Sequence, residues 1–187
     1  MPNVAGKVVA WLMENEAIKE DEKELYEYAF RSLIMLIVPL LLAIGMGIFF
    51  GVFIESLVLI LPFMLIRKFS GGYHAKRQTT CLVISSTLLF TCFWIAEKVS
   101  PNTGLHVVVL VASISLSVFS PVDSENRRLD YEETVSFRKS GRILVTIFLL
   151  IYVLLCAIKG GRFASYLAMG ILLPAGLQIP CILQKEK

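Results

Sequence analysis

The chain has 187 residues, of which 56% are hydrophobic and 18% are charged, and its mean hydropathy is +0.72. Soluble globular domains are usually about 45–50% apolar and about 25% charged, so this composition excludes an ordinary soluble domain. It predicts an all-α, polytopic membrane bundle. The net charge of +3 is small, and the position of the charges therefore says more than their sum.

Residues 1–31 precede the first long apolar stretch and carry seven acidic side chains. They lack a short apolar core followed by a small-residue cleavage site, so they do not read as a secretory signal peptide. Apolar residues recur at helical spacing at Val4, Val8, Trp11 and Leu12, and again at Leu25, Tyr28 and Ala29. We expect an amphipathic segment at the membrane interface, with a cytosolic helix packed on the bundle as the alternative.

Residues 32–187 are expected to form the membrane-embedded domain. A spanning helix needs roughly 20 apolar residues. Residues 33–66 can supply two helices joined by a tight turn near residues 51–55, the second ending before Arg67. Further apolar stretches cover residues 82–96, 105–119, 143–158 and 163–183. The sequence thus predicts about six transmembrane or partly inserted helices.

The distribution of lysine and arginine tests this count. With the N-terminus in the cytoplasm, all of the 18 cations except Lys98, Lys159 and Arg162 fall on the cytoplasmic side, as the positive-inside rule requires. We therefore predict a multi-pass protein of the cell membrane with both termini cytoplasmic. Residues 66–81 and 120–142 then face the cytoplasm, where thiols stay reduced. The second of these segments reads as a solvated loop with short helices.

The stretch RKFSGGYHAKRQTTC, residues 67–81, interrupts the apolar runs and contains His74 and Cys81. A cysteine nucleophile needs a base within about 3 Å. In one continuous helix the two residues would be separated by roughly 10.5 Å along the axis, which is too far. The backbone must therefore fold back if they act as a pair, and Gly71 and Gly72 permit this because glycine adopts backbone angles that other residues avoid.

Cys81 follows two threonines and precedes an apolar helix. Threonine is a good N-cap, so Cys81 is expected in the first helical turn, where the helix dipole and free N–H groups favour a thiolate. Lys76 and Arg77 would also favour the thiolate of Cys81, because they are cations close to it in sequence. His74 would then be the general base. The alternative on spacing alone is a structural cysteine at a helix start and an interfacial histidine.

Metal and cofactor sites are not expected. The four cysteines form no CxxC pair, and two histidines give no zinc-type spacing. Cys92, Cys156 and Cys181 lie in apolar runs and are expected to be small hydrophobic residues inside helices. His106 follows a short outside turn and is expected to lie at the interface. We also expect no nucleic-acid partner.

Arg67, the sequence GGYHA at residues 71–75 and Cys81 together resemble the accessory gene regulator B family. LYEYAF at residues 25–30 and PVDSENRRL at residues 121–129 extend the similarity over nearly the whole chain. Members of this family are integral-membrane cysteine endopeptidases of Gram-positive peptide signalling. The resemblance implies that His74 and Cys81 are the catalytic pair, and that Arg67 and Gly72 have structural or substrate-positioning roles.

The resemblance also implies the substrate. Family members cleave the C-terminal part from a short propeptide, which has an amphipathic leader and an acidic tail, and they help to form a cyclic thiolactone. Residues expected to bind substrate or shape the site are Arg67, Gly71, Gly72, Lys76 and Arg77. The cations among them, with Lys68, could receive the acidic tail, or they could only set topology and contact lipid headgroups.

Three questions stay open on sequence alone. A third residue that orients His74 could be Ser70, Gln78, Asp123, Glu125 or Asn126, chosen by residue type only. A small transporter or peptide-export component is the alternative function, although the spans carry almost no charge apart from Glu55 and Glu97, near their predicted ends. Small residues such as Gly45 and Gly47 would also allow two copies to pack as a homodimer.

Overall fold

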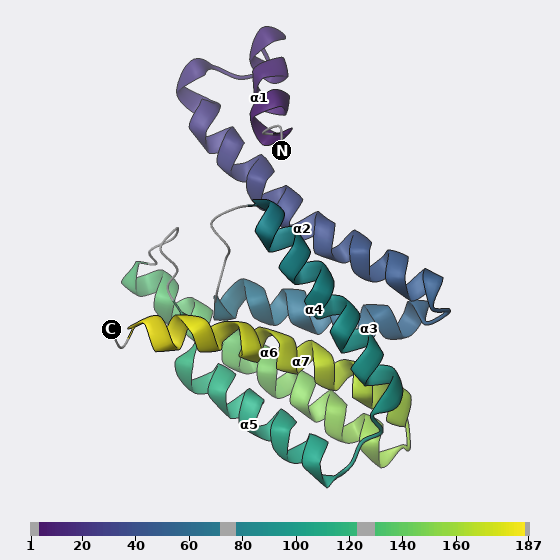
Figure 1. The fold of residues 1–187 in the computed structure, drawn as a ribbon. Coiled ribbons are helices and arrows are strands. Elements are labelled where there is room, and N and C mark those ends of the chain that lie inside the picture. Colours follow the sequence, from purple (N-terminus) through teal and green to yellow (C-terminus); the bar gives the residue numbers. More distant parts are fainter. Residues whose placement is uncertain (1–3, 72–77, 123–129, 186–187) are drawn as a thin grey trace. The chain divides into compact units, whose positions relative to one another are not determined.

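The structure, a computed structural model, describes residues 4–71, 78–122 and 130–185. Its helices are α1 (Val4–Glu14), the 3-10 turn η1 (Glu20–Glu22), α2 (Lys23–Phe49), α3 (Phe53–Ser70), α4 (Gln78–Lys98), α5 (Thr103–Phe119), α6 (Tyr131–Ala157) and α7 (Gly161–Lys185). Within the described residues there is no strand, only one isolated bridge between Gly71 and Val122. The all-α prediction is confirmed (Figure 1).

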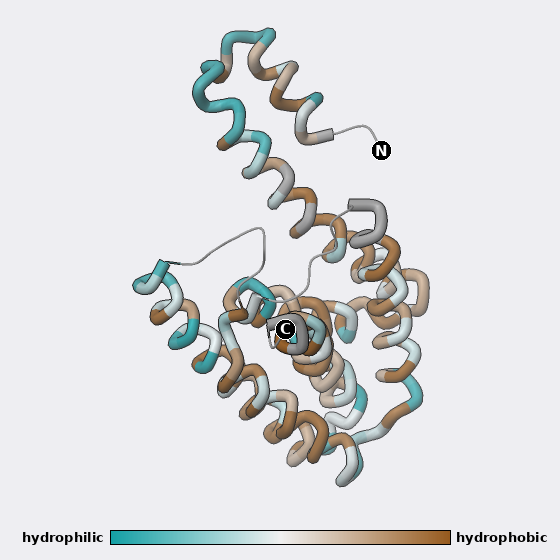
Figure 2. The backbone as a smooth tube through the Cα atoms, turned by 60° about the vertical axis from the view of Figure 1, so that its left-hand side comes forward, coloured by the Kyte–Doolittle hydropathy of each residue, from teal (hydrophilic) through white to brown (hydrophobic). Residues whose placement is uncertain are grey.

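The chain forms two compact units, Met1–Leu42 and Ala43–Lys187. In the first unit, Ala5, Val9 and Ile18 are buried, whereas Trp11 and Tyr28 are exposed. The segment between α1 and α2 is mostly hydrophilic and is drawn largely in teal in Figure 2. This unit therefore has the apolar and polar parts of an amphipathic segment. Its place at a membrane interface stays a prediction.

The second unit is built around α7, which contacts α3, α4, α5 and α6. Residues 164–171 of α7 are all buried. Gly170 lets α3 approach closely, because a β-carbon there would lie 2.6 Å from the backbone carbonyl oxygen of Leu59 and 3.3 Å from Pro62 Cβ. Small residues allow such close helix contacts in membrane bundles, where backbone approach replaces the hydrophobic driving force of water.

Three helical stretches within the described residues are long and apolar enough to cross a membrane: Glu20–Phe49, Tyr131–Ala157 and Gly161–Ile182. Thr103–Phe119 is apolar but shorter. Many large apolar side chains of α5 and α6 are exposed, including Val107, Val111 and Leu150. An apolar surface of this extent is typical of helices that face lipid, and it indicates a membrane protein.

The helix ends differ from the predictions in three places. The second helix of the hairpin was predicted to end before Arg67, but α3 continues to Ser70, and Arg67 and Lys68 in its last turn complement the helix dipole. Residues 120–142 were predicted to be a loop with short helices, but α6 runs without a break from Tyr131. Asp130 caps this helix by accepting a 2.7 Å hydrogen bond from Tyr131 N–H, and Glu132 and Glu133 complement the dipole of its first turn. These local signals extend the helix twelve residues before the predicted span at residue 143.

The third difference is at the start of α4. Thr79 and Thr80 are helical and follow Gln78, so neither is the N-cap that the sequence predicted. An N-cap residue has non-helical backbone angles, and Gln has a higher helix propensity than Thr. Cys81 is still the fourth residue of α4 as the structure describes it, and therefore lies in its first described turn.

Candidate functional site

Arg67 and Gly71 interact with each other at the end of α3. The Arg67 guanidinium donates a 2.7 Å hydrogen bond from Nη1 to the Gly71 carbonyl oxygen, and the Gly71 N–H donates to the Arg67 carbonyl oxygen at 3.3 Å. The last carbonyls of a helix have no intrahelical partner, and a cation there also complements the helix dipole. Arg67 thus helps to close the C-terminus of α3.

Gly71 has backbone angles that favour glycine, with φ of 67° and ψ of −154°. It pairs with Val122, and the Val122 N–H donates a 2.9 Å hydrogen bond to the Ser70 carbonyl oxygen. A β-carbon at residue 71 would collide with the Val122 carbonyl oxygen. The junction between the ends of α3 and α5 therefore requires a glycine at this position.

Gln178 of α7 completes this junction and was missed by sequence reasoning. Its side chain is fully buried, and Nε2 donates to the Ser70 carbonyl oxygen at 3.0 Å and to Ser120 Oγ at 2.8 Å. The signal that could have found it is a lone amide inside the apolar run LLPAGLQIPCIL, because polar groups in such runs are costly. We call Arg67, Ser70, Gly71, Ser120, Val122 and Gln178 the junction cluster.

The structure describes the backbone of Cys81, whereas His74 lies outside the described residues. The Cys81 backbone lies in the first described turn of α4, and its side chain is outside what the structure describes. His74, Gly72, Lys76 and Arg77 lie outside the described residues. The structure therefore brings together the predicted Arg67 and Gly71, and the pairing of His74 with Cys81 stays a prediction.

The proposed orienting residues are placed as follows. Ser70 is buried and its hydroxyl donates a long, 3.3 Å hydrogen bond to the Gly71 carbonyl oxygen. Gln78 opens α4 as described. Asp123, Glu125 and Asn126 lie outside the described residues. Among these candidates, Ser70 is the one whose described contacts belong to the junction cluster.

A second polar cluster joins the other ends of three helices. Arg162 of α7 donates to both carboxylate oxygens of Glu97 of α4, at 3.0 and 3.2 Å, and its Nε lies 3.5 Å from Glu55 of α3. Tyr166 adds a 3.0 Å hydrogen bond to Glu97. Arg162 thus forms ion pairs with both of the carboxylates that the sequence placed near span ends.

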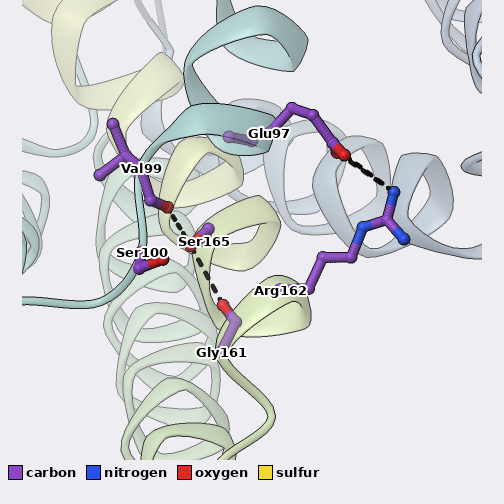
Figure 3. Close-up of a pocket in the computed structure, with 7 residues that line it drawn as sticks. Glu97, Val99, Ser100, Gly161, Arg162 and Ser165 are labelled. Atoms are coloured by element: carbon purple, nitrogen blue, oxygen red, sulfur yellow. Dashed lines mark hydrogen bonds and ion pairs between the residues drawn. The ribbon is translucent and has the colours of Figure 1, made fainter.

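The end of α4, the residues after it and the start of α7 line a small polar pocket of about 170 Å³ (Figure 3). In this pocket Ser165 donates to the carbonyl oxygens of Val99 and Gly161, at 2.5 and 3.0 Å. Glu97 and Cys81 belong to the same helix and are sixteen residues apart, or about 24 Å along a helix axis. The pocket is therefore remote from Cys81, and its polar groups bond to one another.

The second histidine of the chain has a structural partner. His106 Nδ1 lies 2.8 Å from the hydroxyl of Tyr152, and the two rings meet edge to face. In the part of the chain that the structure describes, Cys92, Cys156 and Cys181 are free thiols. No group of three or more His, Cys, Asp and Glu residues that could hold a metal ion occurs among those same residues.

Comparison with known proteins gives a family. The family model described as accessory gene regulator B matches residues 5–182. The chain is 24% identical to "Putative AgrB-like protein 2" of Clostridium perfringens over 160 residues, which are 80% of this chain and 74% of that protein. It is 26% identical to "Accessory gene regulator protein B" of Staphylococcus aureus over 148 residues, which are 79% and 77% of the two chains.

A third relative, the protein of the same name from Staphylococcus saprophyticus, is 25% identical over 143 residues, covering 76% of this chain and 74% of the relative. No solved structure matches the chain. The family model spans nearly all of the sequence, including the stretch from Arg67 to Cys81 and the junction cluster. The chain belongs to the accessory gene regulator B family.

Proposed function

We propose that this protein is a membrane cysteine endopeptidase that removes the C-terminal part of a small signalling propeptide and promotes formation of a cyclic thiolactone for quorum sensing. The observation that carries the proposal is the family match over residues 5–182, which includes the whole motif from Arg67 to Cys81. The position of Cys81 in the first described turn of α4 supports it, because a helix start favours a thiolate.

The chemistry is covalent catalysis in two exchanges. His74 takes the thiol proton of Cys81, and the Cys81 sulfur attacks the scissile carbonyl carbon. N–H groups at the start of α4 would stabilise the oxyanion that forms. His74 then returns the proton to the leaving amine, the C–N bond breaks, and a thioester on Cys81 remains.

A thiol of the propeptide itself resolves this thioester. That thiol loses its proton, attacks the Cys81 thioester and releases Cys81 as a thiol, so that one thioester replaces another and a thiolactone ring closes. Because the exchange is nearly neutral in energy, competing water must be excluded. A pocket within a membrane bundle provides such exclusion.

Arg67 and Gly71 would act mainly through the junction cluster. Their hydrogen bonds close the end of α3, from which the chain continues toward His74. Gly72, Lys76 and Arg77 would shape the site, and the two cations would receive the acidic tail of the propeptide. This division separates residues that hold the backbone from residues that contact substrate.

The proposed topology has six inserted helices, both termini and the catalytic segment in the cytoplasm, and residues 1–31 at the inner surface of a Gram-positive cell membrane. Gly47 is buried against Ser56 of the same chain and is not available for packing with a second copy, so two copies would pack near the exposed Gly45. A transport function gains no support from the described residues, since Glu55 and Glu97 pair with Arg162 at helix ends instead of lining a path.

The test is cleavage of a candidate propeptide by the full chain in lipid vesicles. Cys81→Ala and His74→Ala should each abolish cleavage while melting temperatures stay within a few degrees of the wild type. Cys156→Ala and His106→Ala are matched controls that should retain cleavage, because the first thiol is on α6 and the second residue contacts Tyr152. Cleavage by Cys81→Ala would contradict the mechanism.

A further inference from the structure

We propose that Gln178 is a positioning residue of the active site: it holds Ser70 and Ser120, and so fixes the point and direction from which the chain leaves Gly71 toward His74. This inference rests on the proposed function. It adds a residue from the last helix to a site whose motif lies entirely within residues 67–81.

The amide group of Gln178 joins two other helices. Both of its donor bonds go to residues at the ends of other helices: the carbonyl oxygen of Ser70, the last residue of α3, and the hydroxyl of Ser120, the residue after α5. The Ser70 carbonyl oxygen also accepts from Val122 N–H, so two donors fix it. Gln178 therefore ties α3, α5 and α7 together at a single carbonyl group.

Burying this amide has an energetic cost. Gln178 Oε1 is buried and has no hydrogen-bond partner among the described residues. A buried polar atom without a partner is unfavourable, and a methionine of similar length would avoid it. The side chain is explained by its two donor bonds and not by packing. Local penalties of this kind are expected at functional sites.

Gly71 and His74 are close together along the chain. Gly71 precedes His74 by three residues, and three residues reach at most about 11 Å. The position of Gly71 thus limits where His74 can lie. A displacement of about 1 Å in a catalytic group can reduce a rate about 100-fold. Removing the hydrogen bonds that Gln178 donates should therefore slow the acylation step without removing any group that touches substrate.

The test compares the full chain with the double variant Gln178→Met/Ser120→Ala. Removing both partners leaves neither Gln178 Oε1 nor the Ser120 hydroxyl buried without a partner, so folding should be nearly unaffected. Ser165→Ala is the matched control. Ser165 is also a residue of α7 that donates a hydrogen bond to a backbone carbonyl outside this helix, that of Val99, but it lies at the other end of α7. Each protein is measured in vesicles with the same propeptide.

Three readouts separate positioning from stability. The single-turnover acylation rate should fall about 10- to 100-fold in the double variant, while KM changes less than about twofold. Alkylation of Cys81 by iodoacetamide, resolved by peptide mass spectrometry, should shift its pH midpoint toward the value of about 8.5 for a free thiol. The melting temperature should stay within a few degrees of the wild type.

A wild-type acylation rate in the double variant would overturn the proposal. So would a melting temperature that falls in parallel with the rate, because that would make Gln178 a purely structural residue. The same loss of rate in Ser165→Ala would also overturn it, since the effect would not be specific to the junction cluster. Failure of the proposed function looks different: the wild type itself would not cleave, and both proposals would fall.

Discussion

The substitution Gly71→Ala should disrupt the junction cluster by separating residue 71 from Val122. The residue has φ of 67° and ψ of −154°, a region that costs side-chain-bearing residues about 1–3 kcal/mol. The new β-carbon would also collide with the Val122 carbonyl oxygen, which is backbone and cannot move away by changing rotamer. Separating the two segments breaks the hydrogen bond from Val122 N–H to Ser70, worth about 0.5–1.5 kcal/mol.

Together these effects amount to about 2–4 kcal/mol for Gly71→Ala, or a melting temperature lower by roughly 5–15 °C in a chain of this size. The rate of propeptide cleavage should fall together with the melting temperature. Gly176→Ala is the matched control, because nothing lies within 4 Å of a β-carbon there and alanine favours a helix. The reasoning is refuted if Gly71→Ala melts and cleaves like the wild type in the same detergent and vesicles.

Two further predictions concern charge. Arg162→Leu should lower the free energy of unfolding by about 1–3 kcal/mol, because Glu97 and Glu55, whose side chain is only 13% exposed, would lose their shared cation. Thermal unfolding measures this loss, with Lys159→Ala, at an exposed position, as the control. An unchanged melting temperature in Arg162→Leu would count against the pairing. Lys76→Glu combined with Arg77→Glu should slow cleavage of a propeptide with an acidic tail, and the loss should shrink in high salt or with a neutral tail. Equal rates for both tails would rule out this role.

Much of the fold follows from apolar runs. The predicted stretches at residues 105–119 and 163–183 lie within α5 and α7, because a long apolar segment in lipid must satisfy its backbone as a helix. The start of α6 could not be found this way, since residues 131–142 are polar and helical through capping and first-turn charges. Hydropathy does not register those signals.

The candidate site was predictable only where its chemistry is local. Arg67 and Gly71 belong to one short motif, and their contact spans four residues. Gln178 bonds to residues 108 and 58 positions away, so its partners depend on how α3, α5 and α7 pack. A single sequence shows a lone amide in an apolar run, but it does not show which backbone groups that amide holds.

The most direct measurement of the central claim is the mass of the intact protein after reaction with a propeptide whose ring-forming thiol has been removed. Without that thiol the thioester cannot be transferred and should accumulate. We predict an adduct equal to the N-terminal propeptide fragment, mapped to Cys81, released by hydroxylamine and absent from Cys81→Ala and His74→Ala. Cleavage of the propeptide with no adduct, or with an adduct on another cysteine, would contradict the account.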